Sequence, residues 1–332
     1  MHTESFKALI VEETAPRNFS RRISERRIDA LPPGEVLIRV AYSSLNYKDA
    51  LSATGNPGVT RNFPHTPGID AAGTVAACND GSFKPGETVL VTGYDLGMNT
   101  AGGFGQYIRV PSEWVVPLPD GLTLRESMVL GTAGFTAALS VLKLAANGIK
   151  PDQGDILVTG ASGGVGCIAV ALLAKVGYRV TAATGKMAET DLLTALGASE
   201  VIHRDELLKG AERPMLKERW AGTVDVVGGE TLAAALKATR YGGTVTCCGL
   251  VGSAELQINV FPFILRGVSL LGIDSVQCPM APRLEVWHKL ATEWKLDRLE
   301  PLVQEIGLEG LETAIHTMLK GEAKGRTVVT LA

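Results

Sequence analysis

The stretch from Asp155 to Gly166 constrains the fold of this chain more than any other part of the sequence. It reads Asp-Ile-Leu-Val-Thr-Gly-Ala-Ser-Gly-Gly-Val-Gly, so a short apolar strand leads into a glycine-rich turn. Gly160 and Gly163 allow a tight turn and a close approach to a pyrophosphate, and Gly166 allows the next helix to pack against the sheet. That helix, expected at Val165 to Val176, is apolar nearly throughout, which predicts that it is buried with its positive end toward the phosphates.

The residues after this helix favour a complete dinucleotide-binding βαβ unit. Gly177 ends the helix, and Arg179 to Thr184 has the composition of a second strand at the expected spacing. An ordinary strand-to-helix turn would carry the same glycines, but it would not require a second strand at that distance. The strand, the turn, the helix and the second strand together predict a dinucleotide site.

The end of the second strand indicates which dinucleotide binds. An NAD-preferring site usually has an acidic residue there, about 20 positions past the glycines, to bind the ribose hydroxyls. This chain has Thr184, Gly185 and Lys186 instead, which provide a hydroxyl, a glycine and a cation without a repelling carboxylate. NADPH is therefore favoured. The alternative is that Lys186 is only a solvated surface lysine.

The length and composition of the chain limit the classes of protein to which it can belong. The 332 residues suffice for two domains, and a net charge of −3 gives no indication of a nucleic-acid or anionic-membrane partner. Met1 to Glu13 has no signal-peptide core, and no apolar run reaches membrane-spanning length, so we expect a soluble, cytoplasmic protein. The five cysteines include no CxxC pair, which is typical of reduced thiols and not of disulfides or a structural zinc site.

The order of elements predicts an α/β fold with two parts. The region from Phe6 to Trp114 contains short strands separated by Gly and Pro turns, at Lys7–Val11, Glu35–Tyr42, Ile69–Ala76, Thr88–Thr92 and Gly105–Val110, with at most a helical turn near Tyr47–Ser52. From Leu124 onward, helices and strands alternate as in a doubly wound parallel sheet. The expected helices lie at Arg125–Leu130, Thr132–Leu144, Glu189–Leu196, Thr231–Thr239, Pro282–Trp294 and Leu308–Lys320. The further expected strands lie at Glu200–His203, Val224–Val227, Thr244–Cys248, Val268–Ile273 and Thr327–Leu331.

The strand Val268–Ile273 suggests an assembly. If it forms the edge of the sheet, its unpaired backbone groups can pair with a second subunit. We therefore expect a homodimer through this strand.

Four motifs together resemble one protein family. They are Ser44-Leu45-Asn46-Tyr47-Lys48-Asp49, Pro67-Gly68-Ile69-Asp70-Ala71-Ala72-Gly73, Gly131-Thr132-Ala133-Gly134-Phe135-Thr136-Ala137 and the glycine turn. The whole chain resembles the medium-chain dehydrogenase/reductase superfamily, in its zinc-independent quinone oxidoreductase branch. Within that branch, Arg61-Asn62-Phe63-Pro64, Phe261 to Gly267 and Gly272 to Ser275 are similar to the acryloyl-CoA reductase (NADPH) subfamily.

The resemblance implies a domain arrangement and a set of site residues. It implies a GroES-like β-rich catalytic domain from residues 1–125 and 276–332, and an NADPH-binding Rossmann domain from 126–275. It implies NADPH contacts at Tyr47, Ser162, Gly163, Gly164, Val165, Thr184, Gly185, Lys186, Arg204, Leu250, Ile264, Ser275 and Arg326. Similar proteins often have arginine where this chain has Lys186, which keeps the charge but loses the bidentate fork.

The resemblance also implies chemistry without a metal ion. Zinc-dependent relatives have ligands near Asn46 and near Ile69-Asp70 that this chain lacks, and His65 alone is more often structural than a ligand. Without a Lewis acid, the substrate must already be electrophilic, such as an alkene conjugated to a thioester or a quinone. Tyr47, helped by Asn46, is the expected catalytic residue, either as a proton donor or relay or as a packing surface for the cofactor ring.

The expected reaction is reduction of acryloyl-CoA to propionyl-CoA by NADPH. Arg61, Arg109 and Arg283 are candidates for binding the CoA phosphates, unless they are simply solvated. A quinone oxidoreductase is the alternative enzyme, and a non-catalytic NADPH-binding redox sensor is the alternative of another class. A short-chain dehydrogenase does not fit, because Tyr178 and Tyr241 are not followed by a lysine at the fourth position.

Overall fold

The computed structural model describes residues 4–297 and 299–331 and divides the chain into two compact units. The first unit takes the chain up to Thr132, then Val276–Ala291 and the part from Leu302 onward. The second unit comprises Ala133–Ser275 and Thr292–Pro301. The chain thus passes from the first unit to the second after Thr132, and the segment Thr292–Pro301 groups with the second unit.

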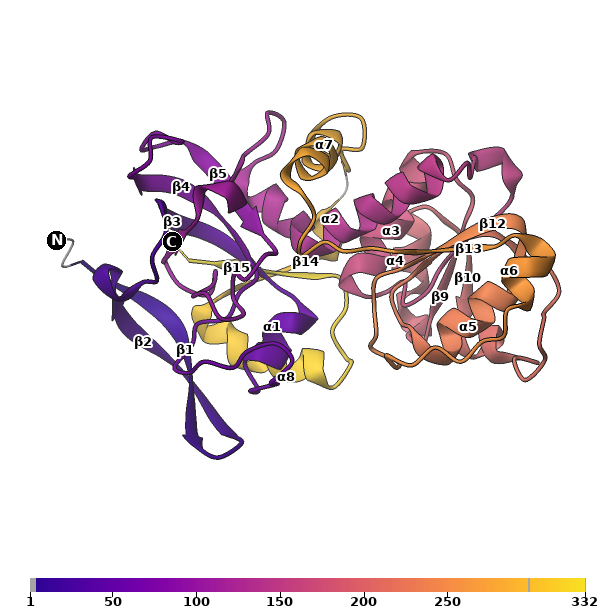
Figure 1. The fold of residues 1–332 in the computed structure, drawn as a ribbon, viewed down its shortest axis with the longest axis horizontal. Coiled ribbons are helices and arrows are strands. Elements are labelled where there is room, and N and C mark those ends of the chain that lie inside the picture. The colour runs from indigo at the N-terminus through magenta and orange to yellow at the C-terminus, as the bar shows by residue number, and fades with distance from the viewer. Residues whose placement is uncertain (1–3, 298, 332) are drawn as a thin grey trace. The chain divides into compact units, whose positions relative to one another are not determined.

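The first unit is built on a seven-stranded sheet that joins both ends of the chain (Figure 1). Its strand order is β14-β15-β3-β4-β5-β7, and β6 pairs with β3. The C-terminal strand β15 lies antiparallel to β3, so the end of the chain completes a sheet begun near its start. The bounds are β3 Val36–Leu45, β4 Asp70–Cys78, β5 Thr88–Thr92, β6 Tyr107–Val110, β7 Val116–Pro117, β14 Val303–Gly307 and β15 Arg326–Thr330. A separate antiparallel hairpin consists of β1 (Ser5–Ala15) and β2 (Asn18–Arg27).

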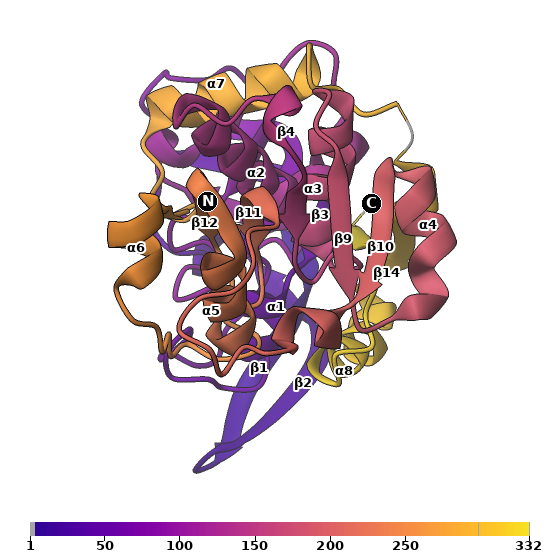
Figure 2. The ribbon, with the colours of Figure 1, turned by 90° about the vertical axis from the view of Figure 1, so that its right-hand side faces the viewer.

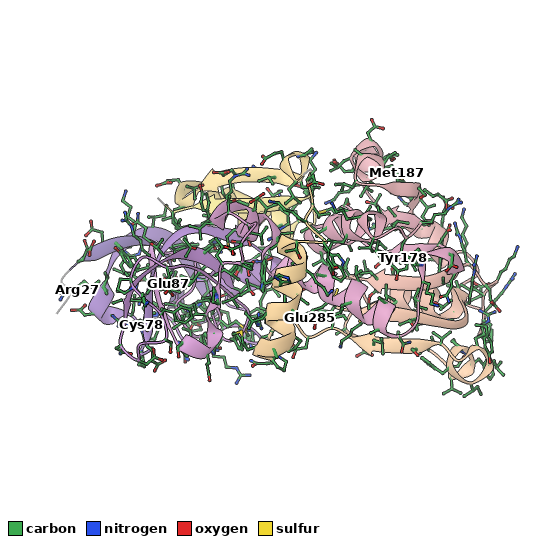
Figure 3. All side chains as sticks on the ribbon, turned by 90° about the horizontal axis from the view of Figure 1, so that it is seen from above. Arg27, Cys78, Glu87, Tyr178, Met187 and Glu285 are labelled. Atoms are coloured by element: carbon green, nitrogen blue, oxygen red, sulfur yellow. The ribbon has the colours of Figure 1, made fainter. Side chains whose placement is uncertain are left out.

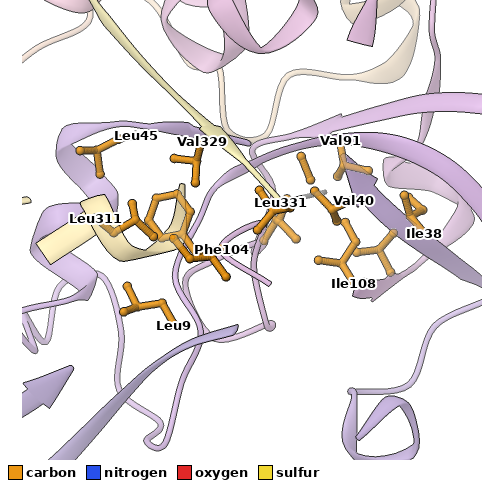
Figure 4. Close-up of a cluster of buried hydrophobic side chains, with 14 of the residues drawn as sticks. Leu9, Ile38, Val40, Leu45, Val91, Phe104, Ile108, Leu311, Val329 and Leu331 are labelled. Atoms are coloured by element: carbon orange, nitrogen blue, oxygen red, sulfur yellow. The ribbon is translucent and has the colours of Figure 1, made fainter. Parts of the chain in front are cut away.

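Alternation along β3 explains how this sheet is covered on both faces. Val36, Ile38 and Val40 point into one apolar cluster, whereas Leu37 belongs to a second cluster with Phe6 and its neighbours. Figure 4 shows the first cluster, in which Leu9 and Phe104 from the first third of the chain lie with Leu311 and Val329 from its end. The helices of this unit are α1 (Tyr47–Ser52), α7 (Met280–Ala291) and α8 (Leu311–Leu319).

The second unit is a six-stranded parallel sheet in the order β10-β9-β8-β11-β12-β13. Numbered within the unit, this order is 3-2-1-4-5-6, which is the Rossmann arrangement with its switch point between β8 and β11. The strands are β8 Ile156–Val158, β9 Val180–Thr184, β10 Ala198–His203, β11 Trp220–Asp225, β12 Thr239–Cys247 and β13 Ser269–Gly272. The helices are α3 Gly164–Lys175, α4 Thr190–Ala195, α5 Gly229–Ala238 and α6 Phe261–Arg266, while α2 (Leu124–Ala146) crosses the unit boundary. As expected, α3 is buried from Gly166 to Leu173 and β13 is an edge strand.

Several elements differ from the sequence predictions for identifiable reasons. Strand β2 was not predicted, because its only large apolar residues are Phe19 and Ile23 and all of its residues are at least partly exposed. The short strand β7 and the mostly polar strand β14 were not predicted either. Strand β11 begins at Trp220 and ends at Asp225, earlier than predicted, because Gly222 pairs with both neighbouring strands instead of breaking the strand.

The two helices predicted on either side of Gly131 form one kinked helix, α2. Gly131 has φ 52° and ψ −155°, a backbone conformation reserved for glycine, and it interrupts the helix at the unit boundary. Contrary to the sequence prediction, this helix is long and apolar enough to cross a membrane by length and composition. However, 78% of its most apolar 18-residue window is buried inside the protein, as in the core helix of a globular unit.

We expect Gly131→Ala to destabilise the first unit far more than a matched substitution elsewhere. A Cβ at Gly131 would lie 2.5 Å from Asp70 Oδ2, 2.6 Å from Ser44 Oγ and 2.9 Å from an Arg326 nitrogen. Gly148 also has a positive φ, of 86°, but a Cβ there meets nothing within 4 Å. Chemical denaturation should give a loss of about 1 kcal/mol for Gly148→Ala, from backbone strain alone, and about 3 kcal/mol or more for Gly131→Ala. Equal losses would contradict the crowding seen at Gly131.

Candidate functional site

The glycine turn between β8 and α3 has the geometry that a pyrophosphate requires. Gly160 has φ 56°, and a Cβ there would lie 2.7 Å from the Val226 side chain. Gly166 packs so tightly that a Cβ would lie 2.3 Å from Gly160 O, which explains the need for glycine at the first turn of the helix. Gly163 closes the turn through its N–H, 2.9 Å from Gly160 O, in an ordinary backbone region.

A buried carboxylate holds this turn at the switch point of the sheet. Asp225, at the end of β11, accepts a hydrogen bond from Thr159 Oγ1 at 2.8 Å and one from the Gly228 N–H at 2.8 Å. Both Asp225 and Thr159 are fully buried, and burial raises the pKa of the Asp225 carboxyl. The pair ties the β8 turn to the loop after β11. This contact was not predicted, and the only signal for it in the sequence is an acidic residue that ends an apolar strand.

The predicted ribose-phosphate residues come together at the ends of β9 and β10, which lie side by side (Figure 2). Ser162 Oγ in the glycine turn is 2.8 Å from Thr184 Oγ1 at the end of β9, so the first and second strands are joined at this edge. Thr184 Oγ1 also accepts from the Lys186 N–H at 3.0 Å. A Cβ on Gly185 would lie 3.0 Å from Arg204 Nε, which shows that the Arg204 side chain lies over this glycine.

Two cationic side chains, those of Lys186 and Arg204, therefore lie at the end of β9. Lys186 is half-buried, and Arg204 is exposed and 3.7 Å from the exposed carboxylate of Asp205. Met187, which follows Lys186 in the sequence, is 42% exposed, and Figure 3 shows it on the outside of the unit. Ribose and phosphate oxygens can be bound here by hydroxyls and cations, and β9 itself ends without an acid.

The other predicted cofactor residues of this unit lie elsewhere on it. Leu250 follows β12 and is 60% exposed, and its Cα would lie 3.3 Å from a Cβ on Gly228, next to the switch point. Ile264 is exposed on α6, and Ser275 is half-buried at the end of the unit. Gly164 and Val165 begin α3 directly after the turn.

Tyr47 and Asn46 belong to the first unit, where they begin helix α1. Asn46 is the N-cap, and its backbone N–H donates to Asp49 Oδ2 at 2.8 Å. Tyr47 is the first residue of the helix and is 40% exposed, and its hydroxyl has no hydrogen-bond partner among residues 4–297 and 299–331. The phenol is therefore available to another molecule.

Asp49 supports this helix from inside the protein. Its carboxylate accepts from the N–H groups of Gly68 at 3.1 Å and Ile69 at 2.8 Å, besides that of Asn46. Burial and the charge of Asp70 raise the pKa of Asp49 to about 7, and they outweigh the opposing effect of the N–H donors. Asp49 thus orients the loop that leads into β4.

Three predicted arginines have different surroundings. Arg326, predicted to contact the cofactor, is 2% exposed in the first unit and donates to Val129 O, Asn46 Oδ1 and Ser44 Oγ. Arg283 is neither solvated nor available to phosphates, because it is fully buried and donates to Thr92 O and Cys278 O. Arg61 is exposed, with its Nε donating to Pro57 O.

No metal site is evident in the part of the chain that the structure describes. It contains no group of three or more His, Cys, Asp and Glu side chains that could hold an ion. His65 is buried with Nε2 2.9 Å from Gly97 O, and burial lowers its pKa. These contacts describe a structural histidine.

Comparisons with known proteins agree with this architecture. Residues 32–120 match the family described as Alcohol dehydrogenase GroES-like domain, and residues 164–291 match the family described as Zinc-binding dehydrogenase. The second match covers most of the Rossmann unit from α3 onward and continues through α7.

Three relatives are similar over nearly their whole length. The putative quinone oxidoreductase YhfP of Bacillus subtilis is 47% identical over 98% of this chain and 99% of its own. Its crystal structure with NAD bound has a TM-score of 0.96, covering 99% of this chain and 100% of that one. The acrylyl-CoA reductase AcuI of Ruegeria pomeroyi is 45% identical over 98% of each chain. The structure of Escherichia coli YhdH with bound NADPH is 43% identical, with a TM-score of 0.94 over 98% of this chain and 100% of that one.

These similarities extend over both units, and the strand order and the glycine turn agree with them. The chain belongs to the medium-chain dehydrogenase/reductase superfamily, with a GroES-like domain and a Rossmann domain, and its close relatives are the acrylyl-CoA reductases and the quinone oxidoreductase YhfP.

Proposed function

We propose that this protein is an NADPH-dependent reductase of activated carbon–carbon double bonds, with acryloyl-CoA as substrate and propionyl-CoA as product, and that it needs no metal ion. The observation that carries the proposal is the strand end where Lys186 and Arg204 flank Gly185 beside the Ser162–Thr184 hydroxyl pair. Two cations and two hydroxyls suit a ribose that carries a 2′-phosphate.

The relatives support both parts of the proposal. AcuI of Ruegeria pomeroyi is named an acrylyl-CoA reductase, and Escherichia coli YhdH was crystallised with NADPH. YhfP of Bacillus subtilis was crystallised with NAD, so close similarity by itself leaves room for either cofactor. The residues at the β9 end favour NADPH for this chain.

The residues of the Rossmann unit fit a dinucleotide. A Cβ at Gly160 or Gly166 would clash, and the turn presents the N-terminus of the twelve-residue helix α3, where N–H groups and the helix dipole bind phosphate. NADPH, when bound, supplies a hydride for the β-carbon of the conjugated alkene. The protein's part is to hold cofactor and substrate in register and to donate to the carbonyl oxygen, where negative charge develops.

Tyr47 is our candidate for the residue that contacts the substrate or the nicotinamide. Its hydroxyl is the available polar group at the start of α1, and it can donate a hydrogen bond or relay a proton to the α-carbon. The amide of Asn46 is already bonded to neighbouring side chains, so we assign it to holding α1 in place.

A quinone oxidoreductase is the second candidate function, because YhfP carries that name and is 47% identical to this chain. An NADPH-binding redox sensor without turnover is the alternative of another class. Both would use the same Rossmann unit. The rates with alkene and quinone substrates therefore distinguish the two enzymes, and the absence of any turnover would identify the sensor.

We propose a homodimer formed through the edge strand β13. This strand pairs only with β12 among the described residues. Helix α6, which precedes it, exposes Ile264 by 68% and Leu265 by 60%, and Val260 just before the helix is 60% exposed. An unpaired strand edge beside exposed apolar side chains favours pairing with a second copy.

A cytoplasmic location is also proposed. None of the five cysteines forms a disulfide, as expected in a reducing compartment. Cell fractionation with an antibody to the protein tests this, and recovery outside the cytoplasm would contradict it.

The cofactor assignment predicts a selective effect of two substitutions. Lys186→Ala and Arg204→Ala should each lower kcat/KM for NADPH roughly tenfold through loss of a charge-assisted contact, and should change kcat/KM for NADH less than about twofold. Arg213→Ala is the matched control, because Arg213 is an exposed cation of the same unit with a neighbouring acid. Equal losses with both cofactors would contradict a 2′-phosphate site.

The substrate assignment predicts an order of activities. NADPH oxidation, followed at its near-ultraviolet absorbance, should be fastest with acryloyl-CoA, slower with crotonyl-CoA and slowest with quinones, because the proposed site provides donors for a thioester enolate. Tyr47→Phe should lower kcat at least tenfold if the hydroxyl donates, while leaving NADPH affinity unchanged. Faster turnover of a quinone would replace the proposed substrate, and binding without any turnover would identify the sensor.

The proposed dimer predicts the molecular mass of the protein in solution and a substitution that should weaken dimerisation. Light scattering after size-exclusion chromatography should give about twice the 35.0 kDa mass of one chain. Leu265→Glu, which places a charge on the exposed face of α6, should shift the protein toward monomer. Leu319→Glu is the control, because Leu319 is a 38% exposed apolar residue on α8 of the other unit. A monomeric wild-type protein would rule the interface out.

A further inference from the structure

Asp70, the first residue of β4, is a fully buried carboxylate that accepts hydrogen bonds from two distant segments of the chain. Its Oδ2 accepts from Ser44 Oγ at 2.6 Å, from Asn46 Nδ2 at 2.7 Å and from the Thr132 N–H at 2.9 Å. Its Oδ1 accepts from the Thr132 hydroxyl. A buried charge is tolerated only when it is satisfied in this way, so these segments are held at one point.

Arg326 completes the set on the other side of Ser44 and Asn46. Its Nη2 donates to Ser44 Oγ at 2.9 Å, and its Nη1 donates to Asn46 Oδ1 at 3.3 Å. The Ser44 hydroxyl therefore accepts from the guanidinium and donates to the carboxylate. A cation and an anion are linked through one buried hydroxyl, which compensates both charges.

This arrangement leaves the Asn46 amide one orientation. Its Nδ2 faces Asp70 and the Ser44 carbonyl oxygen, and its Oδ1 faces Arg326. The flipped amide would place an oxygen against the carboxylate and an NH₂ group against the guanidinium, which are both repulsive. The charges of Asp70 and Arg326 thus lock the side chain of the residue that caps α1.

The next residue along the helix is Tyr47, whose hydroxyl is unpaired within the described residues. Helix α1 has only six residues, too few to hold its own position, so its first turn depends on Asn46 and Asp49. Asp49 fixes the backbone N–H of Asn46, and Asp70 fixes its side chain.

We propose that Asp70 is a positioning residue of the reductase, which acts through the Asn46 amide to hold Tyr47 in its working place at the start of α1. The inference rests on the proposed role of Tyr47, but the contacts that carry it are independent of which substrate is reduced. Asp70 itself is fully buried, so it acts through the side chains that it binds.

The first test reads the position of Tyr47 without any turnover. Protein labelled with ¹³C at the tyrosine ring carbon that bears the hydroxyl gives one signal for each of its 6 tyrosines, and Tyr47→Phe assigns the signal of Tyr47. Asp70→Ala should shift or broaden that signal and leave the signal of Tyr241, 78% exposed in the other unit, unchanged. Asp70→Asn, which keeps the shape and one acceptor, should give a smaller shift and serves if Asp70→Ala does not fold.

A control separates positioning from a general loss of stability. Ser52 lies in the same helix and is fully buried, and its hydroxyl is bonded to Thr60 Oγ1 at 2.7 Å and to Gly97 O at 3.3 Å, away from Asn46. Ser52→Ala should lower the melting temperature without moving the Tyr47 signal. An unchanged Tyr47 signal in both Asp70 variants would overturn the proposal.

The second test is a double-mutant cycle on kcat. Asp70→Asn and Asn46→Ala should each lower kcat roughly tenfold with NADPH affinity unchanged, and the double variant should be no slower than the slower single variant, because both act through one amide. If the losses of kcat in the two single variants multiply in the double variant, or if NADPH affinity falls in parallel, the proposed role of Asp70 is wrong. If the wild-type protein reduces no alkene or quinone, the proposed function fails, while the tyrosine signals still decide the role of Asp70.

Discussion

The first unit depends on one buried charge, the carboxylate of Asp70 at the start of β4. Around it lie the end of β3, the start of α1 and the point where α2 resumes after Gly131. No side chain fits at Gly131, because the carboxylate, Ser44 and Arg326 occupy the space where a Cβ would be. The cost of burying an unsatisfied carboxylate, on the order of several kcal/mol, therefore holds the segment from β3 to α1 and the chain at Thr132 against β4. The kink of α2 follows from the network and not from a local preference of the helix.

The second unit uses the same device at its switch point. Asp225 ends β11, is fully buried and binds Thr159 in the glycine turn and Gly228 in the facing loop. The glycine turn after β8 is thus joined to the neighbouring strand β11 by a side-chain hydrogen bond as well as by the sheet. Burial raises the pKa of this carboxyl, whereas its hydroxyl and N–H donors lower it. In both units, a carboxylate at a strand terminus holds the loops from which the candidate functional side chains project.

Local patterns in the sequence predicted local structure well. The glycine turn, the apolar helix α3 and the edge position of β13 could be predicted, because each depends on neighbouring residues or on strand composition. Strand β2 could not, because its partner is β1 alone and eight of its ten residues are polar or charged, so no clear alternation of apolar and polar residues marks it. Asp70 contacts residues 44, 46 and 132, and Arg326 joins this group through Ser44, only in three dimensions. Arg283 is buried by β5 and by the chain before α7, so no spacing rule in the sequence indicates either arrangement. The approach of Arg204 to Gly185 likewise follows from the pairing of β9 with β10.

The preference for NADPH depends on attraction of its 2′-phosphate by cations. A site that selects NADH usually both binds the ribose hydroxyls and repels a 2′-phosphate with one carboxylate. Here β9 ends in Thr184 and not in a carboxylate, so this residue does not repel a 2′-phosphate. Its hydroxyl is already bonded to Ser162 and to the Lys186 N–H. Preference for NADPH must then come from Lys186, a flexible point charge, and from Arg204, which is exposed and near Asp205. Exposed cations are screened by salt, so the preference should weaken as ionic strength rises, whereas the affinity for NADH should change little.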